Sequence, residues 1–387
     1  MLLHRLALRN LTQTATIRCN NKLKDLLESA ASGFDQQPTT PEDQWSTTPY
    51  PKEAVFDKRD QGRKAKKPNI DPRETSIILF PGQGAQYVGM AEKLLKIPES
   101  RDMFQIAKEV LGYDLLEICM KGPNYKLNQT VYAQPAIAVT SLASLERLKE
   151  ARPHAIEDCV ATAGFSLGEI TALIFAGAIP FDKGLKLIQV RAEAMQIASE
   201  KYPSGMATVF YGPDSKLGEA CVQAKEWCIE KGVEEPTCQI ANYLFPHCKV
   251  VAGNLEALEF LEKNKRQFKL RKVKKLPVSG AFHTNLMGSA IGPFVKALRQ
   301  IEVKDPFIHV HSCIDGKAYK NAEHIQKQLP KQIVKPVKWE QLLHIMYERG
   351  KNKFFPRTFE CAPGNSLISI LKEVNARASD SAISVEK

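Results

Sequence analysis

Two apolar runs, each followed at once by a glycine-containing turn, constrain the fold of this chain more than any other feature of its sequence. SIILF begins at Ser76 and leads into PGQGAQ, and CVATAGF leads into SLGE and a helix predicted to continue to Ile174. Another helix is predicted over residues 87–95. Buried strands that end in glycine turns and alternate with helices are typical of parallel sheets. The sequence therefore predicts an α/β fold.

The pattern changes to shorter units over residues 203–276. MATVFYG, TCQIANYL, KVVAGN and FKLRKVKKL have the composition of strands, and helices are predicted over residues 216–231 and 257–265. Two rounds of strand, helix and strand indicate a small α+β insertion. Longer helices and strands return after it and end near Lys372. The last fifteen residues, 373–387, are polar and are predicted to form a frayed tail.

The N-terminal residues have the composition of a targeting segment. Residues 1–24 contain five basic residues and no acidic one, and Leu2 and Leu6 lie one helical turn apart. This composition predicts a mitochondrial presequence, with the basic tail of a cytosolic protein as the alternative. Residues 25–75 are rich in Pro, Thr, Gln and charged side chains, which predicts a poorly ordered linker.

Composition and cysteine spacing narrow the class of protein. The chain has 387 residues, of which 43% are hydrophobic and 25% are charged, so it can bury a sizeable core. No apolar run approaches the roughly 18–20 residues that span a bilayer. Nine cysteines without any C-x-x-C pair predict neither a disulfide framework nor a zinc site, and they favour a reducing compartment.

The strongest local signal for chemistry is GFSLGE, which begins at Gly164 and ends at Glu169. A G-x-S-x-G segment between a strand and a helix allows a sharp turn that exposes the Ser166 hydroxyl. The N-terminus of the following helix then offers backbone N–H groups to a developing oxyanion. A structural turn with a helix-capping serine explains the same five residues, so both interpretations stand on this motif alone.

A nucleophilic serine requires a base, and His283 in PVSGAFHT is the best placed of the eight histidines. His309 and His311 alternate in an apparent strand, and His247 lies in a loop of the insertion. A buried or surface histidine without a catalytic role is the alternative for each. The PGQGAQ turn lacks the G-K-[ST] and G-x-G-x-x-G patterns of nucleotide loops, so an oxyanion or acyl-site loop is the better interpretation.

Six segments in order carry a resemblance to a known family: FPGQGAQYVGM, GFSLGEITAL, QVRAEAMQ, VSGAFHT, VKPVKW and APGNSL. Together they resemble the malonyl-CoA:acyl carrier protein transacylases, in the form found in mitochondria, over roughly residues 76–372. The resemblance implies an α/β-hydrolase-like large subdomain, residues 76–202 and 277–372, interrupted by a ferredoxin-like small subdomain, residues 203–276. It also implies that the active site lies in the cleft between them.

The resemblance assigns catalytic roles residue by residue. Ser166 would attack the malonyl thioester and His283 would act as its base. The backbone carbonyl at Gln332, rather than an aspartate, would hold the histidine ring. Backbone N–H groups of Gln83 and Leu167 would form the oxyanion hole.

The resemblance also assigns a substrate pocket. Arg191 would pair with the free carboxylate of malonate, because a guanidinium offers two parallel donors to a carboxylate. A surface arginine paired with Glu193 is the alternative. Gln134, Met195 and Asn242 match positions that line the acyl pocket of the family.

This chain departs from the family pattern at two places. Phe165 stands before the serine, where the family often has histidine, and Ala362 replaces a glycine in the E-x-G-P-G segment. The first change would affect only the tuning of the site, and the second would alter a turn.

The function implied is a ping-pong transfer of malonyl from malonyl-CoA to the phosphopantetheine thiol of an acyl carrier protein, for fatty acid synthesis in the mitochondrial matrix. We expect no bound cofactor, metal, nucleic acid or membrane span. We expect the protein to be a monomer. A serine hydrolase that acts on thioesters or esters is one rival. A non-catalytic module that binds carrier protein or RNA is the other.

A formal net charge of +11 is compatible with nucleic acid, a membrane surface or an acidic partner, so the distribution of the charge matters more than its total. Residues 263–275 contain eight Lys or Arg residues and no acidic one, within the predicted insertion. We expect Lys272 and Lys274 to attract an acidic carrier protein or the phosphates of CoA. A solvated surface without a partner is the alternative.

Overall fold

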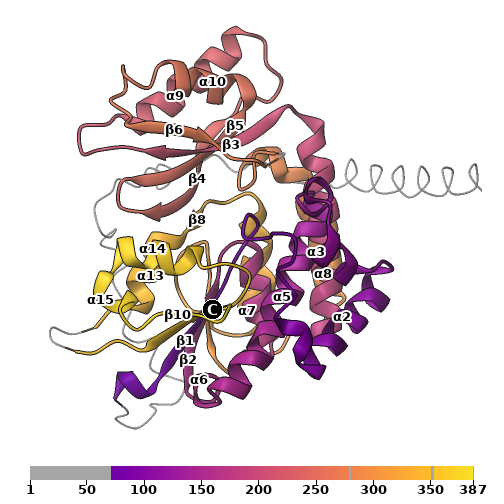
Figure 1. The fold of residues 1–387 in the computed structure, drawn as a ribbon. Helices are drawn as coiled ribbons and strands as arrows, with labels where there is room; N and C mark the ends of the chain where they lie inside the picture. The colour runs from indigo at the N-terminus through magenta and orange to yellow at the C-terminus, as the bar shows by residue number, and fades with distance from the viewer. Residues whose placement is uncertain (1–70, 279, 350–352, 387) are drawn as a thin grey trace, which may run out of the picture.

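Two five-stranded sheets organise the chain in the computed structural model, which describes residues 71–278, 280–349 and 353–386. The sheet of the larger subdomain lies below that of the smaller one in Figure 1. The predicted presequence, residues 1–24, lies outside the described residues, as does the predicted linker up to residue 70.

The larger sheet is parallel throughout and has the strand order β10-β9-β1-β2-β7. Phe80, the last residue of the central strand β1, pairs with Gly164 at the end of β2, so both predicted glycine turns leave the same edge of the sheet. The carboxyl edge of a parallel sheet is where α/β proteins bind ligands. The strands are β1 (Ser76–Phe80), β2 (Cys159–Gly164), β7 (His309–His311), β9 (Arg357–Glu360) and β10 (Ile383–Ser384).

Alternate residues of β1 point into two different helical layers. Ile78 and Phe80 pack in a core with α5, α7 and α8, whereas Ile77 and Leu79 pack in a core with α13 and α14. All five residues of β1 are buried, as expected for a central parallel strand covered on both faces. The two layers flank the sheet in Figure 1. The helices that carry these cores are α5 (Thr130–Ala151), α7 (Leu167–Phe175), α8 (Phe181–Lys201), α13 (Trp339–Met346) and α14 (Ser366–Val374).

Further helices complete the larger subdomain. The predicted helix over residues 87–95 is wrong, because this segment forms consecutive turns and only a 3-10 helix at its end. Gly89 within it has a φ of 95°, a backbone conformation that a helix excludes. The α-helices are α2 (Pro98–Leu111), α3 (Leu115–Lys121), α4 (Asn124–Leu127), α6 (His154–Glu157), α11 (Ile291–Arg299), α12 (Ala322–Gln328) and α15 (Ala376–Ser379), and the 3-10 helices are η3 (Pro72–Glu74), η4 (Leu94–Lys96), η5 (Asn285–Ala290) and η6 (Leu329–Ile333).

The smaller sheet has the order β6-β3-β5-β4-β8. Its first four strands and two helices follow the chain order β3, α9, β4, β5, α10, β6, which is the ferredoxin-like arrangement that was predicted. The short strand β8 comes from the segment after the insertion and adds to β4 in parallel. The elements are β3 (Ser204–Phe210), α9 (Leu217–Glu230), β4 (Cys238–Phe245), β5 (Cys248–Asn254), α10 (Leu255–Lys263), β6 (Lys272–Lys275) and β8 (Val337–Lys338).

The C-terminal residues are ordered into the larger sheet, so the predicted frayed tail is wrong. Ile383 and Ser384 form β10 and pair in parallel with β9. The Val385 side chain is buried, and its N–H donates to the Glu360 carbonyl at 2.9 Å. An otherwise polar segment is held because its short alternation of apolar residues extends the exposed edge of a sheet.

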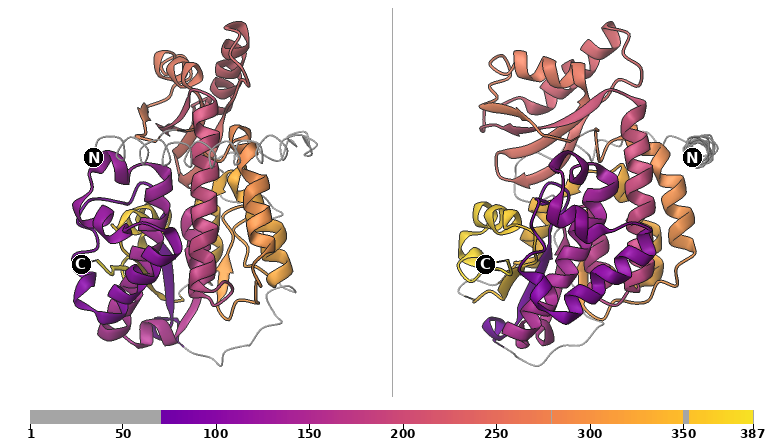
Figure 2. Two further views of the ribbon diagram at one scale, coloured as in Figure 1. Left: turned by 90° about the vertical axis from the view of Figure 1, so that its right-hand side faces the viewer. Right: turned by 45° about the vertical axis from the view of Figure 1, so that its right-hand side comes forward.

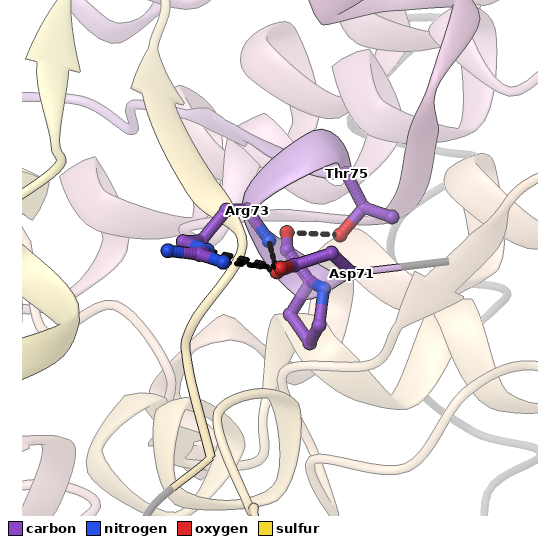
Figure 3. Close-up of polar contacts among 4 residues, drawn as sticks. Asp71, Arg73 and Thr75 are labelled. Carbon is purple, nitrogen blue, oxygen red and sulfur yellow. Dashed lines mark hydrogen bonds and ion pairs between the residues drawn. The ribbon is translucent and has the colours of Figure 1, made fainter. Parts of the chain in front are cut away.

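The described chain begins with a capped turn that leads into β1. The Asp71 carboxylate accepts a hydrogen bond from the Arg73 backbone N–H at 2.9 Å and forms an ion pair with its guanidinium at 2.6 Å (Figure 3). The Thr75 hydroxyl donates to the Pro72 carbonyl at 2.7 Å in the same view. The Arg73 guanidinium also lies 3.9 Å from the centre of the Phe354 ring, so this turn rests on the loop before β9.

Candidate active site

Ser166 occupies a sharp turn between β2 and α7. Its φ of 52° and ψ of −104° lie outside the regions that a residue with a side chain normally adopts. Two flanking glycines make the turn possible. A Cβ atom on Gly164 would lie 1.8 Å from the Gly168 carbonyl oxygen, and one on Gly168 would lie 2.3 Å from the Phe80 carbonyl oxygen. The backbone is therefore packed against itself, and the strained serine projects from the tip of the turn.

His283 joins the serine to a backbone carbonyl. Its Nε2 lies 2.9 Å from Ser166 Oγ, and its Nδ1 lies 2.8 Å from the Gln332 carbonyl oxygen. A carbonyl oxygen can only accept, so Nδ1 carries the proton and Nε2 is free to accept the serine proton. Burial, followed by the charge of Arg191, lowers the pKa of His283 to about 4. The imidazole is therefore neutral near pH 7, as a general base must be.

Arg191 brings a buried positive charge to the same place. It lies on α8, the long helix that runs up to the smaller subdomain in Figure 2, and its side chain is 1% exposed. Its Nη2 donates to Ser166 Oγ at 3.0 Å and to Gln332 Oε1 at 2.8 Å. Burial lowers the pKa of Arg191 to about 10, which still leaves the guanidinium protonated near neutrality. The alternative of a surface arginine paired with Glu193 is wrong.

A row of polar side chains continues from the arginine toward β1. Arg191 Nη1 donates to Gln134 Oε1 at 2.8 Å. Gln134 Nε2 in turn donates to Gln83 Oε1 at 3.3 Å and lies 3.8 Å from the Met195 sulfur. The Gln83 side-chain amide donates to the Thr130 hydroxyl at 3.3 Å. Three elements distant in the sequence therefore supply one continuous wall beside Ser166.

Two backbone N–H groups lie where the glycine turns meet. Leu167 is the first residue of α7, so its N–H has no acceptor within the helix ladder. Gln83 follows Gly82, whose Cβ position would lie 2.4 Å from the Phe165 carbonyl oxygen. The Phe165 N–H also donates to the Phe80 carbonyl at 2.9 Å. The PGQGAQ turn is therefore in contact with the serine turn.

The remaining predicted site residues lie in the smaller subdomain. Asn242 is on β4, with its Oδ1 buried and without a hydrogen-bond partner among the described residues. Lys272 and Lys274 are exposed on β6, the edge strand at the far side of the sheet from β8. The structure therefore does not bring the two lysines into the group around Ser166. From the same subdomain, Gln239 Nε2 donates to the His283 carbonyl at 3.3 Å, a contact that the sequence did not predict.

A buried acid that no sequence motif singled out also lies at this site. Glu169 follows Ser166 by three residues on α7 and is 0% exposed. It accepts hydrogen bonds from Gln332 Nε2, from the Tyr319 hydroxyl at 2.7 Å and from the Cys313 N–H at 3.1 Å. Its place one helical turn after the nucleophile was the available signal.

The described residues contain no group of three or more His, Cys, Asp or Glu side chains that could hold a metal ion. None of the helices in the described ranges is both long and apolar enough to cross a bilayer.

Known proteins share the sequence that carries this arrangement. Residues 77–356 match the family described as the acyl transferase domain. The protein named "Probable malonyl-CoA-acyl carrier protein transacylase, mitochondrial" from Drosophila melanogaster is 61% identical over 319 residues, which cover 82% of this chain and 84% of that protein. The mitochondrial malonyl-CoA-acyl carrier protein transacylase of Homo sapiens is 50% identical over 307 residues, 79% of each chain.

This chain belongs to the malonyl-CoA-acyl carrier protein transacylase family. Solved structures of the family share its two-subdomain fold. An acyl carrier protein S-malonyltransferase from Vibrio cholerae is 29% identical, with a TM-score of 0.71 over 80% of this chain and 96% of that one. A malonyl-transacylase in complex with its type II PKS acyl-carrier protein, PlMCAT:AntF, is 29% identical, with a TM-score of 0.69 over 80% of this chain and 94% of that one.

The two departures from the family pattern are accommodated by packing. The Phe165 ring contacts the Trp339 ring edge-to-face, with centroids 5.4 Å apart, so an apolar contact stands where the family often has histidine. The Ala362 backbone is held on both sides: its carbonyl accepts from the Ser141 hydroxyl at 2.6 Å, and its N–H donates to the Ser144 hydroxyl at 3.1 Å. Neither residue touches Ser166 Oγ, His283 or Arg191 through a hydrogen bond in the described structure.

Proposed function

We propose that this chain transfers the malonyl group from malonyl-CoA to the phosphopantetheine thiol of an acyl carrier protein, through an ester on Ser166. The observation that carries the proposal is a fully buried guanidinium at hydrogen-bond distance from the nucleophile of a serine–histidine dyad. A buried cation beside the reacting atom favours an acyl group that carries its own negative charge. Malonyl has such a carboxylate and acetyl does not.

The first half-reaction forms the acyl-enzyme. As Ser166 Oγ attacks the thioester carbonyl, its proton passes to Nε2 of His283, and the N–H groups of Gln83 and Leu167 stabilise the oxyanion. Collapse of the tetrahedral intermediate breaks the carbon–sulfur bond, and the imidazolium returns the proton to the CoA thiolate. The Gln332 carbonyl keeps the proton on Nδ1 throughout and stabilises the transient positive charge.

The second half-reaction reverses these roles. His283 takes the proton from the phosphopantetheine thiol, the thiolate attacks the serine ester, and Ser166 leaves with the proton restored. Atoms balance, because one thioester is exchanged for another and neither an oxidant nor a metal is required. The dyad, the arginine and the pocket wall all come from one chain, which supports action as a monomer.

Discrimination against acetyl would follow from Arg191. The free carboxylate of malonyl can accept two parallel hydrogen bonds from the guanidinium, whereas acetyl provides no carboxylate to pair directly with this buried charge. The bound carboxylate would also offset the positive charge that lowers the pKa of His283, and so would make the histidine a stronger base when the correct substrate is present. Asn242, whose Oδ1 has no hydrogen-bond partner in the described part of the chain, and Met195 would complete the acyl pocket.

The carrier protein would be attracted by the basic surface of residues 263–275. Lys263 and Lys275 form ion pairs with Glu259 and Glu262, whereas Lys272 and Lys274 are exposed on β6. His283 follows the end of β6 by only eight residues, which links this edge to the site in the sequence. Exposed positive charge of this kind mainly raises the rate of association with an acidic partner.

The reaction would supply fatty acid synthesis in mitochondria. The relatives from Drosophila melanogaster and Homo sapiens are named as mitochondrial proteins, and residues 1–24 have the basic, acid-free composition of a presequence.

Intact mass of the protein after brief incubation with malonyl-CoA or acetyl-CoA tests the proposed reaction. We expect a mass increase of one malonyl group that is absent in Ser166→Ala and weak with acetyl-CoA. Release of CoA without an adduct would instead indicate a hydrolase, and neither adduct nor CoA release would leave a binding role.

Charge reversal tests the docking surface. We expect Lys272→Glu/Lys274→Glu to raise the KM for carrier protein and to leave acylation by malonyl-CoA unchanged. The matched control Lys225→Glu/Lys231→Glu makes the same change in net charge at exposed positions of α9 and its C-terminus. An equal rise in KM in both double variants would mean that only net charge matters.

A further inference from the structure

Glu169 is a buried carboxyl group that the proposed reaction does not use. Its hydrogen-bond partners all act as donors: the Tyr319 hydroxyl and the Cys313 N–H reach Oε1, Gln332 Nε2 reaches Oε2, and the Ser312 hydroxyl also contributes. Burial raises the pKa of Glu169, while these hydrogen bonds lower it. A carboxyl group at 0% exposure is costly unless it is fully satisfied, so its presence one turn after the nucleophile calls for a role.

The contact with Glu169 fixes which way the Gln332 side-chain amide points. Gln332 Nε2 donates one hydrogen to Glu169 and the other to the Ser166 carbonyl at 2.7 Å. Its Oε1 is thereby turned toward Arg191 and accepts from Nη2 at 2.8 Å. The reverse orientation would set amide hydrogens against guanidinium hydrogens and the amide oxygen against two acceptors. Glu169 thus determines that the arginine meets an acceptor.

An amide between the two charges has a consequence that a direct ion pair would not have. Glu169 and Arg191 have opposite charges when both are ionised, yet the hydrogen bonds join each to Gln332 instead of to the other. A direct contact would occupy the guanidinium donors that a substrate carboxylate needs. In the present arrangement the Arg191 Nε, buried, has no hydrogen-bond partner among the described residues. The guanidinium is therefore oriented but retains a free donor.

We propose that Glu169 is a positioning residue for substrate selection: through the Gln332 side chain it holds the Arg191 guanidinium beside Ser166, ready for a free carboxylate. The inference rests on the proposed function and adds a residue that acts on selectivity and not on the chemistry of the dyad. Gln332 then has two separate tasks, because its backbone carbonyl orients His283 and its side chain orients Arg191.

Glu169→Gln tests this role with little change in volume. Donors from Tyr319, Cys313 and Gln332 converge on both oxygens of Glu169, but a glutamine side chain provides a single acceptor oxygen. Its NH₂ group must therefore oppose either the Cys313 N–H or the Gln332 amide, and the second outcome turns the Gln332 NH₂ toward the arginine. Misdirecting one hydrogen bond to a charged group predicts a loss of roughly 10- to 100-fold.

The measurements separate selectivity from chemistry. We expect Glu169→Gln in the full chain to lower kcat/KM for malonyl-CoA by that factor, mainly through KM, and to reduce the ratio of malonyl to acetyl transfer. Labelling of Ser166 by a fluorophosphonate, which has no carboxylate to recognise, should remain within about threefold of wild type. Equal losses of labelling and malonyl transfer would show a merely structural role and overturn the proposal, as would an unchanged malonyl-to-acetyl ratio.

A double-mutant cycle tests whether the effect passes through Gln332. Gln332→Met keeps the backbone carbonyl that holds His283 and removes the side-chain amide. In that background Glu169→Gln should cause no further loss of the malonyl-to-acetyl ratio, and a fully additive loss would overturn the relay. If Glu169→Gln fails to fold, Tyr319→Phe provides the same test, because it removes another hydrogen bond to the carboxylate. We expect a smaller loss of the malonyl-to-acetyl ratio in this variant, and an unchanged ratio would count against the proposal.

Failure of the proposed function would look different. In that case the wild-type chain itself would show no preference for malonyl over acetyl. If wild type does show the preference and Glu169→Gln retains it in full, only the role of Glu169 is refuted.

Discussion

Replacement of Arg191 by methionine removes the charge and all donors of this side chain while it retains most of the apolar stem. In the structure Arg191 is 1% exposed and its guanidinium lies 3.0 Å from Ser166 Oγ, so a malonyl group on the serine has its carboxylate within reach of it. Each hydrogen bond to a charged group contributes about 1.5–3 kcal/mol, and a carboxylate accepts two. The loss is therefore about 3–6 kcal/mol, or roughly 10²- to 10⁴-fold in kcat/KM for malonyl-CoA.

Acetyl-CoA should respond in the opposite sense. Acetyl offers the guanidinium no carboxylate to pair with in the wild-type pocket, so Arg191→Met should leave kcat/KM for acetyl-CoA unchanged or raise it. Arg191→Lys retains the charge but loses the planar pair of donors, and we expect a malonyl loss between those of wild type and Arg191→Met. Initial rates with malonyl-CoA and with acetyl-CoA, measured over a range of substrate concentrations, give kcat and KM separately for each thioester.

A lysine on the same helix as Arg191 provides the control. Lys186→Met changes an exposed lysine on the same helix, whose Nζ donates to Gln189, and should leave both rates unchanged. Parallel losses for malonyl and acetyl in Arg191→Met, with an unchanged melting temperature, would refute recognition of the carboxylate by this arginine. A loss of less than about fivefold for malonyl would refute it as well, because that corresponds to less than 1 kcal/mol.

Three further predictions follow from the same structure. Because the neutral form of His283 is the active base and its pKa is lowered to about 4, kcat/KM should be flat near neutrality and fall only as the pH drops through about 4; an acid limb centred near 6.5 in a pH–rate profile would contradict this. Gly168→Ala would place a Cβ 2.3 Å from the Phe80 carbonyl oxygen and should lower the free energy of unfolding, measured by denaturant titration, by about 3 kcal/mol. In the control Gly218→Ala the new Cβ meets nothing within 4 Å, so this change should be neutral or stabilising by up to about 1 kcal/mol. Removal of residues 383–387 deletes β10 and should lower the free energy of unfolding by about 2 kcal/mol, which is the contribution of one buried valine. An unchanged melting temperature would show that this strand adds no stability.

Local sequence patterns predicted the elements whose structure depends on hydrophobic periodicity alone. The run SIILF became a fully buried strand, and the insertion became the ferredoxin-like unit, because strand and helix periodicities are readable over a few residues. The helix over residues 87–95 failed where Gly89 adopts a positive φ inside a helix-like apolar spacing. The tail failed because the pairing of Ile383 with Phe359 depends on a sheet edge that no local pattern reveals.

The turn that presents Ser166 and the chemical types of the site residues can be predicted from the amino-acid sequence alone. Glycines at 164 and 168 are required where backbone meets backbone, and this requirement is visible in the motif. Which groups meet at Ser166 depends instead on how the chain packs in three dimensions. Gln332 reaches Ser166 across 166 positions of sequence, with its backbone on the histidine and its amide between Glu169 and Arg191. Such contacts arise from how separate elements pack, and burial then makes each unsatisfied donor or charge costly enough to fix one arrangement.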